Sequence, residues 1–337
     1  MNASQVRYIR RGQVQGQLSR PPLETAPPVR EGHMDTRPLG KDGPQVSIIS
    51  FGAFPISGEM GPVSRDTAVA TVQAAVDAGM TFIDTAQSYL TSESIVGEAI
   101  RGRRDDVFLA TKVSVGHTPQ EIDDAIGNSL RALGTDHVDL YQLHGPRPQP
   151  IDQTMEHLLR LRDAGKFRYI GISNFSAEQT TEALKYGPIH SSQPIFNMLF
   201  RDAADEVVPC CRENGIGVIA HSVLSKGLLT GRYKPGHPFP DDEDRRGRAH
   251  FDDETFAPIF PVTERLKEWA VDHGRNLVQL AIAWTLAQPG ITAAIVGAKS
   301  PEQVNHNAKA ADWRLTDSEL EEIDAIQGDL RLHPGIV

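Results

Sequence analysis

The chain has 337 residues, of which 39% are hydrophobic and 23% charged, and its formal net charge is −10 at neutral pH. This composition is that of an ordinary globular protein, and no apolar run approaches the roughly 20 residues that cross a bilayer. The negative charge argues against a general nucleic-acid binder, because a phosphate backbone selects clustered Lys and Arg. Small-molecule partners fit this composition better.

The first part of the chain reads differently from the rest. Residues 1–33 contain scattered arginines and two Pro-Pro pairs, with hardly any periodic apolar pattern. We expect this segment to be a disordered N-terminal extension and residues 34–337 to form a single domain. The only cysteines, Cys210 and Cys211, are adjacent, and such neighbours rarely form an ordinary structural disulfide. A reducing, cytoplasmic location is therefore expected, with a vicinal redox pair as the alternative.

From Met34 onward, short apolar runs alternate with longer helical patterns. The expected strands are Val46–Phe51, Thr81–Asp84, Val107–Lys112, Val138–Leu143, Tyr169–Ser173, Gln193–Phe196, Gly217–Ala220 and Ala294–Gly297. Cap signals bracket the helical patterns: one is opened by Ser64 and closed by Gly79, and another is opened by Thr118 and closed by Gly134. Eight such units favour a closed (β/α)8 TIM barrel of parallel strands over an open doubly wound sheet.

One interval between strands is much longer than the others. The seventh strand is followed by the polar stretch YKPGHPFPDDEDRRGRAHFDDETF, residues 233–256, and then by helical segments around Val262–Gly274 and Leu277–Ala287. A loop of this length inside a compact domain is usually a lid or a binding loop. Its charge run DDEDRRGR, taken alone, is typical of solvated surface. A further helix is expected at the C-terminus.

Polar side chains stand at the ends of most predicted strands. In chain order they are Asp84 with Tyr89 just beyond it, Lys112, His144, Ser173 and Asn174, Gln193, and His221 and Ser222. In a barrel the reacting groups come from the C-terminal ends of strands and the loops that follow. Any one of these residues could be a helix cap, a surface lysine or a core histidine. Six strands with such groups at one rim indicate a functional site.

Four of these positions hold the groups of an acid–base device: Asp84, Tyr89, Lys112 and His144. A tyrosine hydroxyl titrates near ~10, and a neighbouring ammonium lowers that pKa. We expect Lys112 to supply this charge and Asp84 to hold Lys112 in place. Tyr89 would then donate a proton near neutral pH, with His144 as a second donor that also orients the substrate. Such a device would protonate the oxygen of a carbonyl that receives a hydride.

Six segments also carry a family resemblance. They are FIDTAQSY (Phe82–Tyr89), ATK (Ala110–Lys112), DLYQLH (Asp139–His144), AGKFRYIGISNF (Ala164–Phe175), GLLTGRY (Gly227–Tyr233) and IVGAKSPEQVNHN (Ile295–Asn307). With these motifs the chain resembles the aldo-keto reductase superfamily from about Met34 to Ile326. Within this superfamily, the chain resembles the bacterial branch of inositol-catabolism-type and general-stress reductases, and relatives of the potassium-channel beta subunit, more closely than it resembles the mammalian aldose reductases. The resemblance implies an NADPH-dependent reductase of small aldehydes or ketones in which the four residues above form the catalytic tetrad.

The same resemblance implies a set of cofactor-binding residues. It assigns Ser173, Asn174 and Gln193 to the nicotinamide carboxamide, His221 to the position that stacks on the nicotinamide, Ser222, Leu224, Lys226 and Leu228 to the pyrophosphate, Lys299, Ser300, Gln303 and Asn307 to the adenosine end, and Gly52, Ala53 and Gly297 to the cofactor in general. Independently, Ser300 and the proline after it read as an N-cap and first turn, and a helix N-terminus is an anion site. Because Lys299 adds a cation there, NADPH is favoured over NADH.

Three positions depart from the family pattern. His221 stands where most members place a tyrosine that stacks on the nicotinamide, although an imidazole can also stack. Gln87 replaces a common acidic residue, and Leu90 replaces a frequent glycine directly after Tyr89. Both of these flank the catalytic loop, so we expect them to shape the mouth through which the substrate enters.

Other functions stay open at this point. A lysine at a strand end also suits a Schiff-base nucleophile, as in barrel aldolases, and Lys112 is the candidate. The resemblance to channel beta subunits permits a cofactor-loaded, redox-sensing partner protein of low turnover. A metal site of Asp84, His144 and His221 is not expected, because no His-x-x-x-His pair or cysteine set supports it. The choice of carbonyl or polyol substrate and the oligomeric state do not follow from the sequence.

Overall fold

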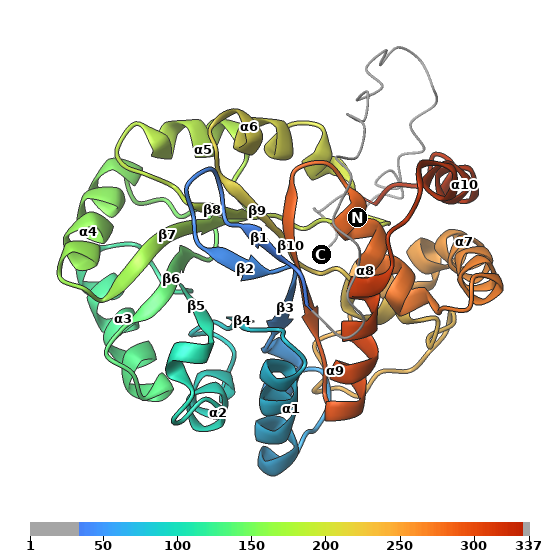
Figure 1. The fold of residues 1–337 in the computed structure, drawn as a ribbon, viewed down its shortest axis with the longest axis horizontal. Coiled ribbons are helices and arrows are strands. Elements are labelled where there is room, and N and C mark those ends of the chain that lie inside the picture. The colour runs from blue at the N-terminus through green and yellow to red at the C-terminus, as the bar shows by residue number, and fades with distance from the viewer. Residues whose placement is uncertain (1–33, 333–337) are drawn as a thin grey trace.

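The computed structural model describes residues 34–332, in which eight parallel strands close into a barrel surrounded by helices (Figure 1). The expected extension at residues 1–33 lies outside the described residues. The barrel strands are β3 (Ile49–Gly52), β4 (Phe82–Asp84), β5 (Phe108–Val113), β6 (Val138–Leu143), β7 (Phe167–Ser173), β8 (Ser191–Gln193), β9 (Gly217–Ala220) and β10 (Ile291–Gly297). Strand β10 pairs with both β3 and β9, which closes the ring. The predicted TIM barrel is confirmed.

Helices follow the strands around the ring. They are α1 (Arg65–Asp77), α2 (Ser92–Ala99), α3 (Pro119–Leu133), α4 (Ile151–Asp163), α5 (Ala177–Leu184), α6 (Val207–Glu213), α7 (Asp253–Asp272), α8 (Leu277–Ala287), α9 (Pro301–Ala308) and α10 (Asp317–Gln327). Short 3₁₀ turns are η1 (Phe54–Ser57), η2 (Arg104–Asp106), η3 (Asp202–Ala204), η4 (Ser225–Thr230), η5 (Ala249–Phe251) and η6 (Lys309–Asp312). The predicted caps are present, since Ser64 accepts from the Thr67 amide and Thr118 forms a capping box with Glu121. None of the helices in residues 34–332 has the length and apolarity needed to cross a membrane.

The first predicted strand, Val46–Phe51, was wrong as a single element. Its beginning belongs to an antiparallel hairpin of β1 (Thr36–Pro38) and β2 (Gln45–Ser47), which lies across one end of the barrel (Figure 1), and its end forms β3. The chain turns at Ser47, whose hydroxyl donates to the Ile49 carbonyl and accepts from the Phe82 amide. The Ser47 side chain thus makes hydrogen bonds at the point where strand pairing is interrupted. The single apolar run is divided there between the hairpin and the barrel sheet.

The sixth predicted strand, Gln193–Phe196, is also displaced. Strand β8 ends at Gln193, because Pro194 has no N–H to continue the ladder, and only an isolated bridge at Ile195 follows. The strand instead begins at Ser191, in a polar pair that lacks the apolar signal used for prediction. Strands seven and eight were placed correctly at their C-terminal ends, which matter most for the site.

The helix expected at Val262–Gly274 begins earlier, at Asp253, and contains Pro258 and Pro261. A proline inside a helix costs a hydrogen bond, which is why the prediction started after them. A continuous buried face holds the helix together through both prolines: Phe256, Ile259, Thr263, Leu266 and Ala270. Helix α7 packs with α10 outside the ring, next to α8 (Figure 1). These two are additions to the alternating β/α units.

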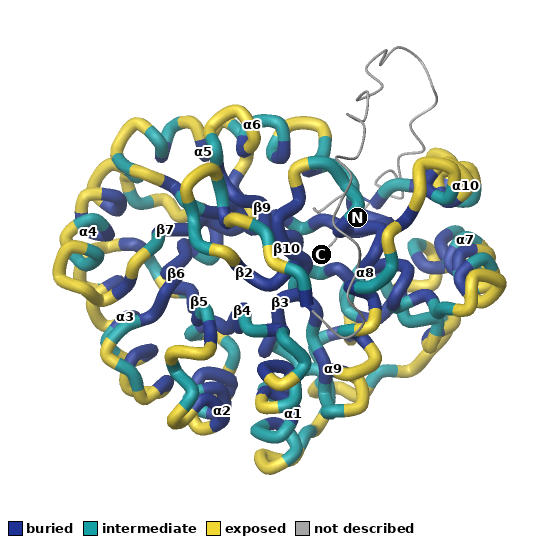
Figure 2. The backbone as a smooth tube through the Cα atoms, in the orientation of Figure 1, coloured by how far each residue is buried: buried dark blue, intermediate teal, exposed yellow. Residues whose placement is uncertain are grey.

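The two ends of the barrel differ in chemistry. Figure 2 shows buried strands inside a shell of helices whose outer faces are exposed. At the N-terminal end, Leu39 and Val46 of the hairpin region pack with Phe82, Leu140 and Ile219 in a small apolar cluster that closes the barrel. The C-terminal end instead carries buried polar residues, among them the predicted strand-end residues Asp84, Lys112, Ser173 and Gln193. In this architecture the site is therefore expected at the C-terminal end.

Candidate active site

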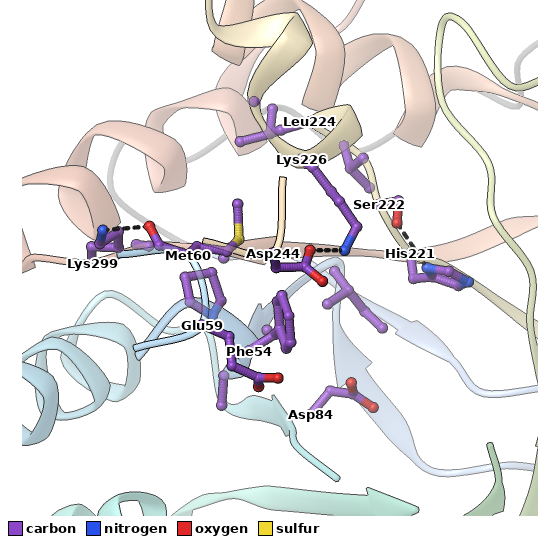
Figure 3. A pocket seen from close by; sticks show the side chains of 18 of the residues that line it. Phe54, Glu59, Met60, Asp84, His221, Ser222, Leu224, Lys226, Asp244 and Lys299 are labelled. Carbon is purple, nitrogen blue, oxygen red and sulfur yellow. Dashed lines mark hydrogen bonds and ion pairs between the residues drawn. The ribbon is translucent and has the colours of Figure 1, made fainter. Parts of the chain in front are cut away.

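The C-terminal ends of the strands open into a cavity of about 1100 Å³, part of which is seen in Figure 3. The predicted residues that line it are Gly52, Ala53, Asp84, Tyr89, His144, Ser173, Asn174, Gln193, His221, Ser222, Leu224, Lys226, Gly297, Lys299, Gln303 and Asn307. Three do not. Lys112 lies beneath the floor without exposed surface, and Leu228 is buried in the apolar core. Ser300 caps α9, where its hydroxyl accepts from the Gln303 amide.

A buried ion pair forms the base of the site. Lys112 Nζ lies 2.5 Å from Asp84 Oδ2 and donates to the Thr85 carbonyl at 2.9 Å. The other carboxylate oxygen, Asp84 Oδ1, accepts from Gln142 Nε2 and Gln193 Nε2, each at 3.0 Å. Burial alone would lower the pKa of Lys112, but the charge of Asp84 and the interactions with Asp84 and Tyr89 outweigh it and raise that pKa. Lys112 is therefore an ammonium with a fixed position.

Tyr89 stands on the short loop between β4 and α2. Its amide donates to the Ala86 carbonyl at 3.1 Å, and its ring contacts Phe54 edge-on with the centroids 5.0 Å apart. Lys112 Nζ lies 5.2 Å from the ring centroid. The expectation that Lys112 lowers the Tyr89 pKa was wrong in its net result. Burial raises this pKa more than the Lys112 charge lowers it, so the hydroxyl is held in its protonated form, which is the form of a proton donor.

His144 completes the predicted set. Its Nε2 lies 3.4 Å from the Tyr89 hydroxyl, and its Nδ1 lies 2.7 Å from Ser114 Oγ. Burial, followed by the charge of Lys112, lowers the pKa of His144 to about 3. The imidazole is therefore neutral near physiological pH and cannot act as a cation there. Sequence reasoning missed Ser114, which follows β5 by one residue.

A second polar group surrounds His221. Its Nε2 lies 2.9 Å from Asn174 Oδ1 and its Nδ1 lies 3.0 Å from Ser222 Oγ (Figure 3 shows the latter contact). Asn174 Nδ2 in turn donates to Ser173 Oγ at 3.1 Å. Burial, then the charge of Lys112, lowers the pKa of His221 to about 3. Two hydrogen bonds hold the neutral ring at the wall of the cavity, and its stacking on a nicotinamide stays a prediction.

The opposite side of the cavity is cationic. Besides the predicted Lys226 and Lys299, it is lined by Arg232, Arg245 and Arg248, which sequence reasoning did not single out, and these cations outnumber the carboxylates there, which are Glu59, Asp244 and Glu302. Lys299 Nζ donates to the Met60 carbonyl at 2.8 Å, and burial, followed by the charge of Arg245, lowers its pKa. Arg232 also lowers the pKa of Lys299, against an opposing contribution from Glu243. Such a group of cations suits an anionic ligand.

Residues 243–248, here called the strap, reach across this side of the cavity. Asp244 forms ion pairs with Lys226 and Arg248, and its amide donates to the Glu59 carbonyl at 2.9 Å. Arg245 Nη2 donates to the Met60 carbonyl at 3.1 Å. Figure 3 shows Asp244 and Lys226 facing each other above Phe54 and Glu59. The interpretation of DDEDRRGR as solvated surface was thus wrong for Asp244 and Arg245, although Asp241, Asp242 and Arg246 are exposed.

The lining residues fit a nicotinamide dinucleotide. The cavity is larger than a typical small-ligand pocket, as a dinucleotide requires. Amide groups of Asn174 and Gln193 lie at one side and cations at the other, which matches a carboxamide and phosphates. Gly52 and Gly297 are register partners at the rim, and a Cβ on Gly297 would come 2.5 Å from Pro55 Cγ. Within residues 34–332, no group of three or more His, Cys, Asp and Glu is arranged to hold a metal ion.

Comparison with known proteins adds independent information. Residues 48–327 match the aldo/keto reductase family. The chain is 35% identical over 309 residues to the aldo-keto reductase YhdN of Bacillus subtilis, with 87% of this chain and 93% of that protein covered. It is 31% identical to the NADP(+)-designated aldo-keto reductase yakc of Schizosaccharomyces pombe, with 86% and 90% covered. Among solved structures, the glycerol dehydrogenase AKR11B4 of Gluconobacter oxydans is similar with a TM-score of 0.79 and 31% identity, over 88% of this chain and 96% of that one.

Proposed function

The chain belongs to the aldo/keto reductase family of oxidoreductases, and from this we propose that it reduces small aldehydes or ketones to alcohols with NADPH. The observation that carries the proposal is the convergence of Tyr89 and His144 on one end of the cavity, above the buried pair of Lys112 and Asp84. Three of these side chains line the cavity and the fourth supports them from below. The arrangement offers two neutral hydrogen-bond donors to one substrate oxygen.

The protein's residues divide the chemistry between them. When bound, the nicotinamide supplies a hydride to the carbonyl carbon and is oxidised. Tyr89 gives its proton to the carbonyl oxygen, so the carbonyl gains two electrons and two hydrogens in all and becomes an alcohol. The ammonium of Lys112 stabilises the tyrosinate that this transfer leaves behind, and Asp84 keeps Lys112 charged and in place. His144 orients the carbonyl oxygen from the other side.

We infer a preference for NADPH from the cations at the adenosine side. Lys299, Arg232 and Arg245 line the same part of the cavity, and α9 begins there with Ser300 as its N-cap. An additional phosphate on the ribose would meet these cations and the helix N-terminus. One relative, from Schizosaccharomyces pombe, carries NADP(+) in its name. A cytoplasmic location is proposed with this reductive role and rests on the sequence alone.

The replacement Tyr89→Phe tests the proposal directly. We expect NADPH-dependent reduction of 4-nitrobenzaldehyde to fall on the order of 10²–10⁴-fold, because the general acid is removed, while NADPH still binds. Steady-state kinetics and fluorescence titration with NADPH and NADH measure the two effects separately. Tyr186→Phe, at an exposed tyrosine on the outside of the barrel, is the matched control and should keep full turnover. Wild-type activity in Tyr89→Phe would remove Tyr89 from the mechanism.

The two alternatives fare differently against the structure. Lys112 is fully buried and paired with Asp84, so its amine is not placed to attack a substrate carbonyl, and a Schiff-base reaction has no structural support. A redox-sensing partner protein would use the same cofactor cavity. Negligible turnover over a panel of carbonyls and polyols, together with tight retention of NADPH, would favour the sensor over the reductase.

A further inference from the structure

His144 is neutral in this site, and a neutral imidazole has one nitrogen that donates and one that accepts. Which nitrogen carries the proton decides what the ring does to Tyr89. We propose that Ser114 is a positioning residue that fixes His144 in the tautomer protonated on Nε2, and thereby keeps the proton of Tyr89 available for the substrate. The inference rests on the proposed function for its consequence in catalysis, but not for the tautomer itself.

The contact between Ser114 and His144 is built by strand register. Strands β5 and β6 are neighbours in which Val113 pairs with Leu143, and each of the two functional residues is the next one along its chain. The His144 amide also donates to the Val113 carbonyl at 3.1 Å. The Ser114 Oγ to His144 Nδ1 distance of 2.7 Å is shorter than the 3.4 Å from His144 Nε2 to the Tyr89 hydroxyl. The serine is therefore the closer partner of the ring.

The two tautomers have opposite effects on Tyr89. If His144 carried its proton on Nδ1, Nε2 would be a bare acceptor and the Tyr89 hydroxyl would donate to it. The proton needed by the substrate would then point at the imidazole. If Ser114 donates to Nδ1, the proton sits on Nε2, and both Nε2–H and the Tyr89 hydroxyl can point at one carbonyl oxygen. A serine hydroxyl can donate or accept, and in the proposed direction, with Ser114 as donor to Nδ1, the bond at one ring nitrogen sets the role of the other.

Ser114 is itself held from three directions. It follows β5, its amide donates to Gln87 Oε1 at 3.4 Å, and its carbonyl accepts from Arg147 Nη2 at 2.9 Å. Gln87 belongs to the loop that carries Tyr89, and Arg147 to the loop that follows His144. The backbone of Ser114, from which the hydroxyl projects, is therefore held in position relative to both catalytic loops. Gln87, one of the three departures from the family pattern, gains a concrete contact in this way.

The test compares Ser114→Ala, which removes the hydroxyl, with Ser114→Thr, which keeps it. Both are studied as the complex with saturating NADP⁺. In ¹⁵N NMR spectra of histidine-labelled protein, we expect wild type and Ser114→Thr to show His144 Nδ1 unprotonated and Nε2 protonated, and Ser114→Ala to show a mixture. With NADPH and 4-nitrobenzaldehyde, kcat should fall roughly 10- to 100-fold in Ser114→Ala only, as is typical when the partner that orients a functional histidine is lost.

If Ser114 only supported the fold, its replacement would lower the affinity for NADPH and the thermal unfolding temperature. The affinity for NADPH and the thermal unfolding temperature should stay close to wild type in Ser114→Ala, and Ser94→Ala, which removes an exposed hydroxyl on α2, should change nothing. A wild-type spectrum with Nδ1 protonated overturns the inference, even if Ser114→Ala does not fold. An unchanged kcat in Ser114→Ala overturns it as well. Absence of turnover in wild type would instead defeat the proposed function, and the NMR spectra would still decide the tautomer.

Discussion

The two sides of the cavity are built by different means. In the catalytic corner, made of Asp84, Tyr89, Lys112, His144 and Ser114, all residues but Tyr89 lie within or directly after neighbouring strands, and Asp84 contacts Lys112, and Ser114 contacts His144, across one strand pair. On the strap side, Lys226 comes from η4, Lys299 from the loop before α9, and Asp244 and Arg245 from the long loop after β9. Their partners are the backbone of Glu59 and Met60, each other, and the side chains of Tyr233, Glu243 and Arg248.

This difference matches two different demands. Proton transfer needs atoms held within a fraction of an ångström, which parallel-strand register supplies. A cofactor must enter and leave, which requires contacts that can open, and loops that meet across a cavity can separate without disturbing the barrel. The catalytic corner should therefore respond to substitution through stability and turnover, and the strap side through the kinetics of cofactor binding.

The largest effect is expected for Lys112→Met. It leaves the Asp84 carboxylate buried without its cation, which should lower the free energy of unfolding by about 3–5 kcal/mol. Turnover should fall to the level of Tyr89→Phe, because the tyrosinate loses its charge partner. Chemical denaturation and steady-state kinetics measure the two losses.

A second replacement separates stability from chemistry in this pair. In Lys112→Met with Asp84→Asn no buried charge remains, and the asparagine still offers its oxygen to Gln142 and Gln193. Most of the unfolding free energy should return while activity stays lost. If the double variant were as unstable as Lys112→Met, the unpaired carboxylate would not be the cause.

The residues of the catalytic corner were largely predictable because the strands that carry them follow a regular pattern along the sequence. Strand ends can be read from apolar runs, parallel strands end at one rim, and titratable residues at those ends must meet. Asp84, Lys112 and His144 follow from this reasoning without side-chain detail. Gln142 was missed although it is an amide inside an apolar strand, which is a usable signal. Ser114 was missed because a serine after a strand is common in any loop.

The strap side was not predictable in the same way. Its contacts join segments with no shared period, and the same letters DDEDRRGR suit both a solvated loop and one that folds inward. Only the tertiary structure shows that Arg245 is buried while Arg246, next to it, is exposed. The net pKa of Tyr89 was misjudged for a related reason, since the effect of burial depends on a three-dimensional environment that sequence spacing does not report.

That pair of adjacent arginines gives a matched test of the strap. Arg245→Ala removes the bonds to the Met60 carbonyl and the Tyr233 hydroxyl together with the ion pair to Glu243. We expect NADPH to dissociate roughly 30-fold faster, which corresponds to about 2 kcal/mol, and association to be no slower. Arg246→Ala loses two exposed contacts, an ion pair with Asp241 and a hydrogen bond to the Phe239 carbonyl, and should leave both rates unchanged. Stopped-flow fluorescence measures the rates of NADPH association and dissociation. Equal effects of the two variants would show that the strap does not hold the bound cofactor in the cavity.

Among these replacements, the smallest effect at neutral pH is expected for that of His221, which lies between the catalytic corner and the strap side of the cavity. His221→Tyr places the more usual family residue there, and the aromatic ring can still stack on a nicotinamide. Above pH 6.5 the histidine is neutral in both the folded and the unfolded protein, so its titration contributes nothing to stability. Between pH 6.5 and about 3 the unfolded chain takes up a proton that the folded site refuses, and the free energy of unfolding falls as pH decreases.

The replacement should remove this one contribution, up to about 1.4 kcal/mol per pH unit, from the acid side of the stability curve. Loss of the bonds to Asn174 and Ser222 adds a cost that does not depend on pH, so the two proteins are compared by slope rather than by absolute stability. Denaturation at several pH values from 7 down to 4 gives both slopes, and burial and the Lys112 charge, which are the larger causes of the low His144 pKa, are present in both proteins. Identical slopes would mean that His221 accepts its proton as readily in the folded protein as in the unfolded chain, and that the neutral ring does not depend on burial beside Lys112.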